Sequence, residues 1–421
     1  MIITALTFLI LTAPLLIIPL TWWAIEYGLA AVILLLPTYL LRSTILGIPT
    51  TNLELAIYGL VLGAILHWTL RGSWPRLQIP RLGRWFLGGW CVAWILATVF
   101  STDRSASLGA LKAWLVDPLL FGFILLATVT TVKRLRLLLH AVASSGTIVA
   151  IAGLIQLVAY HETLQDGRLS SFFAPVANYA AMFLAPMLIL TVGALLWKHL
   201  NRWWWLGAMV MFVALTLTVS FGGYVSLGVG LLVLWWRWPD RRQRRLALIA
   251  AIIIAAVGLA ALSQTPYLAE KFNTRDRSSS LVRTQIWRTS VEMIRDHPLV
   301  GIGPNAYEPI YRATIPRLYW PPLEWLVAQP HQLYLALWLE TGLLGLIVFL
   351  GGTMWWFKHL AGPWRRGESL VILAVATYLG VLVHGFVDTP LFKNDLAIIL
   401  VLIVCLPFLK IGSVDKKIHP A

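Results

Sequence analysis

Charged residues are scarce in this sequence. Only 12% of its 421 residues are charged, whereas 59% are hydrophobic, and the mean hydropathy is +0.79. The apolar runs are repeatedly long enough to cross a hydrocarbon core of roughly 30 Å. They are continuous rather than alternating, which excludes an outer-membrane β-barrel. The composition therefore predicts an all-α polytopic membrane protein.

Cysteine is also scarce. Cys91 and Cys405 both fall inside predicted helices and lie far apart, so they indicate ordinary buried thiols rather than a disulfide framework or a metal site. The N-terminus lacks the charged region and the small-residue cleavage site of a removable signal peptide, so the first apolar run is expected to remain as a span. Without an internal repeat or a low-complexity linker, residues 1–421 are predicted to form a single membrane domain.

Acidic residues are few as well, with 18 Asp and Glu against 33 Lys and Arg, for a net charge of +15. Such a balance raises the question of nucleic-acid binding. The basic residues, however, form short clusters between apolar runs, where they set the orientation of a membrane protein. We therefore expect membrane lipids, and no nucleic acid, as partners. The clusters lie at 71–84, 133–136, 198–202, 237–245, 358–366 and 410–417.

The candidate spans alternate regularly with these clusters. Every interval between two clusters holds an even number of crossings, so all six clusters can lie on the cytoplasmic side. About 12 or 13 crossings are expected. With 13, Met1 lies outside; with about 12, the short second segment is half of a bent pair. The spans are 2–20, 25–42, 53–70, 85–100, 109–130, 136–160, 177–197, 203–219, 222–238, 246–263, 332–357, 368–388 and 394–411.

The longest polar interruption, residues 264–331, is predicted to be a large extracytoplasmic loop with short amphipathic helices. One such helix is expected from an N-cap near Ser279 to about Arg295. On it, Arg288 and Glu292 are four residues apart and are expected to pair. Arg283 has no acidic partner at helical spacing on its C-terminal side. It is interpreted either as a snorkelling arginine at the lipid headgroups or as an anion clamp, because guanidinium offers a fork that suits phosphate oxygens.

Two histidines flank the later part of this loop. His297 precedes a proline and is interpreted as part of a capped turn rather than as a catalyst. His331 stands at the mouth of a long span, where a neutral imidazole can accept a proton. The alternative for His331 is a polar helix-start residue wetted by headgroups. Tyr334 shares its helix face, whereas Glu340 is turned about 180° away and is not an obvious orienter for His331.

Other polar residues are expected at the same outer face. Arg168 lies in a second outer loop, and Asn178 stands at the entrance of the helix that follows. His384 and Asp388 are four residues apart near the outer end of their span. Intramembrane ionisable residues are candidates for function. Alternatively, the two side chains bind each other and hold the helices of the bundle together. Both interpretations stay open.

Several strings follow one another in order along the chain. Residues 297–303 read His-Pro-x-x-Gly-x-Gly, residues 331–335 read His-Gln-x-Tyr-Leu, and residues 340–342 read Glu-Thr-Gly. Together they resemble the O-antigen ligase and O-antigen polymerase superfamily, whose usual form is a His-Pro-x-x-Gly-x-Gly turn and a later His-Asn-x-x-Leu ahead of Glu-x-Gly. Residues 168–178 are similar to the family's Arg-x-x-Gly…Asn element, and residues 384–388 look like its His-x-x-x-Asp span.

The resemblance implies a GT-C-like glycosyltransferase of the cytoplasmic (inner) membrane with its active site on the extracytoplasmic face. Such an enzyme moves a glycan from an undecaprenyl-diphosphate carrier to an acceptor hydroxyl on a lipid or a glycan, without a metal or another cofactor. By this resemblance His331 is the general base, and Arg283 is the diphosphate-binding arginine of the large loop. Substrate binding is further expected of Arg168, Asn178 and Tyr334, and support of Arg288, His384 and Asp388.

Two positions depart from the family pattern. Gln332 stands where asparagine is common, and Ser220-Phe221-Gly222 stands where the family has Ser-Arg-Gly, a second diphosphate site. Arg168 is the candidate to supply the missing charge. Ligase and polymerase both remain open, because they differ in the acceptor.

The alternative from another class is a multi-pass solute or ion transporter that uses His384 and Asp388 as a relay. Transporters often show an internal duplication and interrupted helices near the midplane. Here no duplication is visible, and the polar residues collect at one face.

Overall fold

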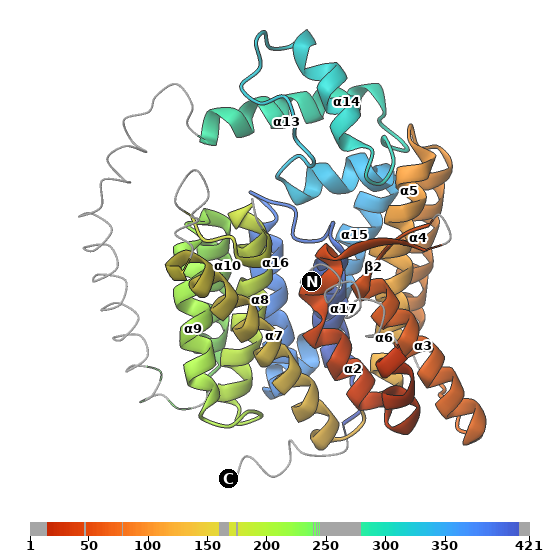
Figure 1. Cartoon of the computed structure of the whole chain (residues 1–421), viewed down its shortest axis with the longest axis vertical. Coiled ribbons are helices and arrows are strands. Elements are labelled where there is room, and N and C mark those ends of the chain that lie inside the picture. The colour runs from red at the N-terminus through yellow and green to blue at the C-terminus, as the bar shows by residue number, and fades with distance from the viewer. Residues whose placement is uncertain are drawn as a thin grey trace.

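The computed structural model describes residues 15–45, 48–77, 79–159, 168–173, 176–238, 240, 242, 244 and 279–411. The predicted span 246–263 and most of the predicted span 2–20 lie outside these residues, as do residues 264–278 of the long loop. Within them the chain is a bundle of helices, with a single two-stranded hairpin (Figure 1). The prediction of an all-α polytopic membrane protein is confirmed.

The helices of the bundle coincide closely with the predicted spans. Six described helical segments are long and apolar enough to cross a membrane, and five shorter apolar helices accompany them. They are α2 (Ile25–Leu34), α3 (Asn52–Leu70), α4 (Arg81–Val99), α5 (Arg104–Leu111) continuing through the π-helix η2 (Lys112–Val116) into α6 (Asp117–Thr128), α7 (Val132–Ala159), α8 (Ala177–Leu196), α9 (Trp204–Leu217), α10 (Phe221–Arg237), α15 (Leu333–Arg366), α16 (Ser369–His384), and α17 (Asn394–Cys405) with the 3-10 turn η6 (Leu406–Phe408).

The second predicted span, 25–42, is built differently from the others. Residues 15–23 are helical, the helix breaks at Ala24, and α2 follows only as far as Leu34. Pro37 then opens the 3-10 helix η1 (Leu36–Leu40), because proline disfavours continuation of an α-helix. The antiparallel strands β1 (Arg42–Ile45) and β2 (Ile48–Thr51) complete the segment. This hairpin was not predicted.

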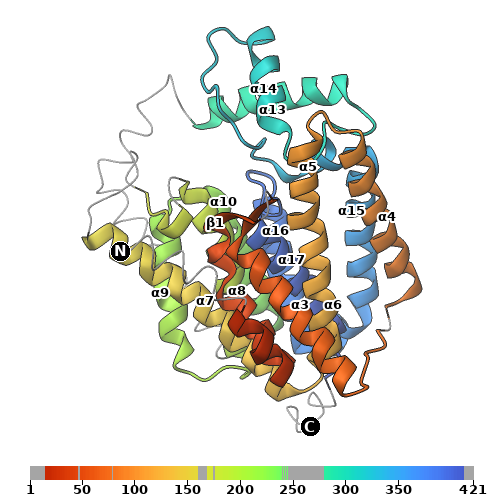
Figure 2. The same cartoon turned by 45° about the vertical axis from the view of Figure 1, so that its right-hand side comes forward.

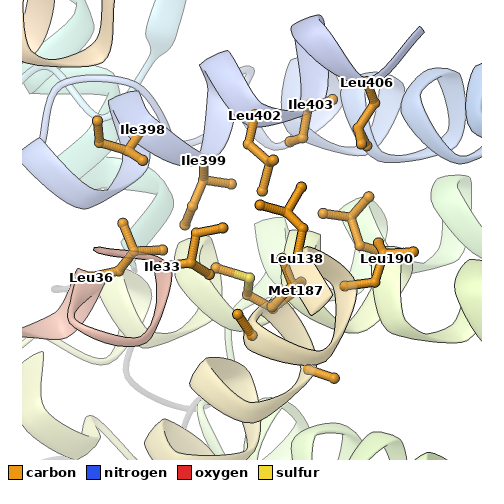
Figure 3. Close-up of a cluster of buried hydrophobic side chains, with 14 of the residues drawn as sticks. Ile33, Leu36, Leu138, Met187, Leu190, Ile398, Ile399, Leu402, Ile403 and Leu406 are labelled. Carbon is orange, nitrogen blue, oxygen red and sulfur yellow. The ribbon is translucent and has the colours of Figure 1, made fainter. Parts of the chain in front are cut away.

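The core lies around α8, which is apolar on all sides and almost entirely buried. Helices α7, α9, α10, α16 and α17 pack around it. Figure 3 shows the contact where Leu138 of α7 and Met187 of α8 meet Ile399 and Leu402 of α17. Away from the core, large apolar side chains are exposed on the outside of the bundle, which is the surface that lipid tails cover. Examples are Val92, Ile95, Ile148 and Ile347.

The described members of the six basic clusters lie at one end of the bundle, called here the basic end. Contacts between connections support this placement: Arg237 donates to the Trp364 carbonyl at 2.6 Å, and His199 bonds to Ser369 at 3.0 Å. At the opposite end, called the loop end, α13 (Ser279–Asp296), α14 (Tyr307–Thr314) and the 3-10 turn η5 (Ile315–Arg317) lie across the bundle (Figures 1 and 2).

The turn between α13 and α14 is fastened to a break in α15. Gly342 has φ 72° and ψ 179°, so two helical pieces meet there. The amide of Leu343 then donates to the Leu299 carbonyl at 2.9 Å, and the amide of Ile302 donates to the Leu339 carbonyl at 2.8 Å. A Cβ atom at Gly301 would lie 2.3 Å from that Leu339 oxygen. Positive φ and close backbone approach both require glycine here.

Two further groups fasten the same turn. The buried Glu340 carboxylate accepts from the Asn305 amide at 2.5 Å. On the other side, the Ser107 hydroxyl donates to the Pro304 carbonyl at 2.7 Å, and the Thr102 amide donates to the Ile302 carbonyl at 3.1 Å. The His-Pro-x-x-Gly-x-Gly and Glu-Thr-Gly strings therefore join the loop-end layer to the bundle.

We expect Gly342→Ala to destabilise the protein by about 2 kcal/mol, because alanine is strained at this φ and its Cβ would lie 2.5 Å from the Leu299 oxygen. Thermal unfolding in detergent measures the change. Gly228→Ala is the matched control, since a Cβ there has no neighbour within 4 Å in helix α10. Equal melting temperatures for Gly342→Ala and the wild type would contradict a strained junction.

Candidate active site

His331 lies at the loop end, in the turn that opens α15. Its backbone has φ 49°, a left-handed conformation that is unusual for a residue other than glycine. Contacts on both sides impose it: the Gln329 amide group donates to the Phe392 carbonyl at 3.0 Å, and the Leu333 amide donates to the Gly385 carbonyl at 2.7 Å. The position of His331 is thus set by the turn between α16 and α17.

The His331 imidazole is bonded to Asp388, which lies in that turn. The Nδ1 atom is 2.9 Å from the Asp388 Oδ1 atom, and the carboxylate is 1% exposed, whereas the imidazole is 29% exposed. Burial raises the pKa of Asp388, but the hydrogen bond and charge of His331 oppose it. With the charges of His384 and Arg283 added, the net result is a pKa below the ordinary value.

An ionised Asp388 determines the tautomer of His331. A carboxylate accepts but does not donate, so Nδ1 carries the proton in this hydrogen bond. In the neutral ring the Nε2 atom then carries the lone pair. The pair therefore orients a histidine as a proton acceptor, with a buried carboxylate to stabilise the imidazolium that forms.

His384 is the second histidine beside Asp388. Its Nε2 atom is 3.9 Å from the Asp388 Oδ2 atom, too far for a hydrogen bond, and neither atom has a hydrogen-bond partner among the described residues. The ring lies against the start of α10, where a Cβ on Gly222 would be 2.7 Å from Nε2. Asp388 thus binds His331 rather than forming a closed pair with His384.

The first turn of α10 is the segment where an arginine was missing from the family pattern. Ser220 caps this helix by accepting from the Gly223 amide at 3.3 Å, and Phe221 is exposed. The first amides of a helix have no intrahelical acceptor and carry the positive end of its dipole. A positive backbone terminus therefore stands beside His384.

Arg283 reaches this region from helix α13. Its positive charge is one of the causes that lower the pKa of Asp388. Among the described residues no hydrogen bond or ion pair engages its guanidinium. The side chain is partly exposed. Arg283 thus acts electrostatically on the same buried carboxylate that His331 binds.

Arg168 and Asn178 are bonded to each other. The Arg168 Nη2 atom donates to the Asn178 Oδ1 atom at 2.5 Å, and Nε donates to the Thr218 carbonyl at 2.7 Å. Thr218 precedes the α9–α10 turn, whose residue Val219 has φ 48°. The predicted outer-loop arginine and the helix-entrance asparagine therefore support the turn that presents α10.

The remaining predicted residues have other neighbours. The Tyr334 hydroxyl donates to the Leu382 carbonyl at 3.0 Å, so it joins α15 to α16. Arg288 is exposed and lines a separate hollow on α13 with Trp287. Its expected pairing with Glu292 is wrong, because Glu292 binds Arg295 instead, at 2.9 Å. The two possible pairs, Arg288–Glu292 and Arg295–Glu292, both face solvent and have similar helical spacing. The side-chain rotamers therefore determine which pair forms.

His297 lies in a turn, as its position before a proline predicted. Its amide donates to the Met293 carbonyl at 3.1 Å, and its carbonyl accepts from the Gly301 amide at 3.2 Å. It therefore closes the end of α13.

One feature of the site was missed in the sequence, namely the bond between Asp388 and His331. The sequence signal for this bond was an acidic residue, Asp388, at the outer end of the span that forms α16. Across the described residues, no group of three or more His, Cys, Asp and Glu is arranged to hold a metal ion.

The fold and this site define a class: a polytopic helical membrane protein with a histidine–aspartate pair and a nearby arginine at one end of the bundle. Residues 206–350 match the family model described as O-antigen ligase. This match supports the resemblance of the chain to the O-antigen ligase and polymerase superfamily. The matched region contains Arg283 and His331, whereas Arg168 and Asp388 lie outside it. No curated protein matched the chain.

We expect Asp388→Asn to lower the melting temperature most near neutral pH. A carboxyl whose pKa is lowered by folding stabilises the folded state above its unfolded pKa of about 3.9, and this contribution is lost as pH falls through the folded pKa. The difference from the wild type should therefore shrink from about pH 5 towards pH 3. Thermal unfolding across this range measures it.

The control is the same substitution in a His331→Phe background. Because the hydrogen bond from His331 is one cause of the lowered pKa, Asp388→Asn should then cost less at neutral pH. The same loss in both backgrounds would refute energetic coupling of the pair.

Proposed function

We propose that this protein is a glycosyltransferase that moves a glycan from an undecaprenyl-diphosphate carrier to an acceptor hydroxyl on a lipid or another glycan. The proposal rests mainly on one observation: at one end of a helical membrane bundle, His331 is bonded to Asp388, and the charge of Arg283 acts on the same carboxylate. The family domain over residues 206–350 supports it independently.

His331 acts as the general base in this reaction. The acceptor oxygen attacks the anomeric carbon of the donor sugar, and its proton passes to the His331 Nε2 atom. The bond between that carbon and the diphosphate oxygen breaks, and its electron pair leaves with the diphosphate. Asp388 holds the ring by Nδ1 and stabilises the imidazolium.

Arg283 stabilises the leaving diphosphate. A guanidinium offers two parallel N–H donors to phosphate oxygens, and a preorganised charge stabilises negative charge as it develops. The first turn of α10 supplies a second positive element, from backbone amides in place of the arginine that the family pattern has at Phe221. Arg168 positions this turn through its bond to the Thr218 carbonyl, and Asn178 holds Arg168 in place.

The loop end is the extracytoplasmic face in this proposal, and the membrane is the cytoplasmic membrane. The basic end carries the described Lys and Arg clusters, and such clusters favour the cytoplasmic side. A lipid-borne donor then reaches His331 from within the membrane, while its diphosphate lies at the surface. Ligase and polymerase activities differ only in which hydroxyl receives the glycan.

We expect His331→Ala to reduce glycan transfer by about 10²–10⁴-fold, since a positioned general base contributes this much. The assay is release of undecaprenyl diphosphate from a lipid-linked glycan by purified protein in proteoliposomes. The melting temperature of the variant shows whether it folds. Wild-type turnover by folded His331→Ala protein would overturn the assigned base.

Arg283→Lys is expected to lose nearly as much activity as Arg283→Ala, because lysine keeps the charge but lacks the bidentate fork. Arg295→Ala is the matched control: it removes an exposed arginine from the same helix, where Arg295 pairs only with Glu292 among the described residues. Full donor turnover by Arg283→Lys would show that the fork is unnecessary.

A further inference from the structure

A large cavity lies between two pairs of helices in the membrane-spanning part of the bundle. Its volume is about 690 Å³, within the range of roughly 300–1,000 Å³ that small-molecule sites occupy. One wall comes from α4 and α15 and the other from α6 and α17; Figure 2 shows α4, α6 and α15 side by side. The lining is mostly apolar and includes Phe86, Trp90, Phe123, Phe349 and Val401.

Small residues help to form the hollow. Gly352 lies on the α15 wall, and a Cβ there would be in ordinary contact with Phe86 at 3.6 Å. Gly122 lies on the α6 wall opposite Val401. A Cβ at Gly122 would lie 2.6 Å from Val401, so this glycine allows α6 and α17 to approach closely, whereas Gly352 leaves space on the α15 wall. An apolar hollow of this shape between membrane helices is chemically matched to a hydrocarbon chain.

Aromatic rings lie at the loop end of this cavity. Trp114 lies 6.4 Å from Trp94 and 5.6 Å from Phe392 between ring centres, and Trp94 lies 6.3 Å from Phe392. The Trp114 indole donates to the Asn394 side chain at 3.2 Å, which orients it. Leu391 of the turn between α16 and α17 also lines the cavity, whereas His331, Arg283 and Asp388 do not. The cavity is therefore separate from the candidate active site.

Basic side chains lie at the other end of the cavity. Arg76 and Lys410 both line it, and both are exposed at the basic end of the bundle. No acidic residue lines the cavity. An apolar channel that ends at a guanidinium and an ammonium matches a molecule with a hydrocarbon chain and an anionic head. Each Lys or Arg near an anionic lipid surface contributes about 1 kcal/mol, or about five-fold, to such binding.

We propose that this cavity binds an anionic diacyl phospholipid from the leaflet at the basic end, with one acyl chain between the two helix walls and the phosphate at Arg76 and Lys410. A zwitterionic lipid places an additional positive group at this basic mouth and binds less tightly. The polyprenyl tail of a donor at His331 enters from the opposite leaflet.

Native mass spectrometry of the detergent-purified, full-length protein tests the proposal. With added dioleoyl phosphatidylglycerol and dioleoyl phosphatidylcholine, we expect one molecule of the anionic lipid to bind about ten-fold tighter than the zwitterionic one. The double variant Arg76→Gln/Lys410→Gln should reduce this preference to about two-fold. Lys198→Gln/Arg202→Gln removes the same charge from the basic end outside the cavity lining and should leave the preference intact.

A second variant tests the apolar part. Gly352→Phe fills the cavity and should weaken binding of both lipids, with its melting temperature reporting whether it folds. Equal binding of the two lipids to the wild type, or an unchanged preference in Arg76→Gln/Lys410→Gln, would overturn the proposal. So would displacement of the bound lipid by an equimolar polyprenyl phosphate, which would assign the cavity to the donor tail. None of these readouts depends on glycosyl transfer.

Discussion

The hydrogen bond between His331 and Asp388 is the interaction on which the candidate site depends. A carboxylate that is 1% exposed in a membrane protein carries a large desolvation cost unless positive groups surround it. His331 donates a hydrogen bond to this carboxylate, and Arg283 of helix α13 adds positive charge. The groups that keep Asp388 ionised are therefore also the groups that a lipid-linked diphosphate and an attacking hydroxyl require.

The loop-end layer must stay in register with the bundle for Arg283 to remain near Asp388. The junction of Gly301 with Leu339, of Gly342 with Leu299, and of Glu340 with Asn305 provides this register. This junction thus explains two of the motifs that carry the family resemblance, His-Pro-x-x-Gly-x-Gly and Glu-Thr-Gly. Their glycines permit backbone approaches that any side chain would prevent, and Glu340 works at this junction rather than at His331.

Most of the helices could be predicted because a membrane imposes strong constraints on a sequence. A backbone in hydrocarbon must bond internally, so a long apolar run such as residues 177–197 has few alternatives to helix. The β1–β2 hairpin escaped prediction because each strand is only four residues long and the two lie between predicted spans. The pairing of Glu292 also escaped, because Arg288 and Arg295 both lie at helical spacing from it and small rotamer differences decide between them.

Local periodicity and charge determined the class of protein, the course of its spans and the end at which His331, Arg283 and Arg168 stand, because these properties depend on neighbours along the chain. Only the tertiary structure decided which carboxylate meets His331, that Arg168 supports the α9–α10 turn, and that an apolar cavity ends at Arg76 and Lys410. Contacts between residues distant in the sequence follow from how helices pack, and packing depends on side-chain shapes across many helices at once. No local pattern records that arrangement.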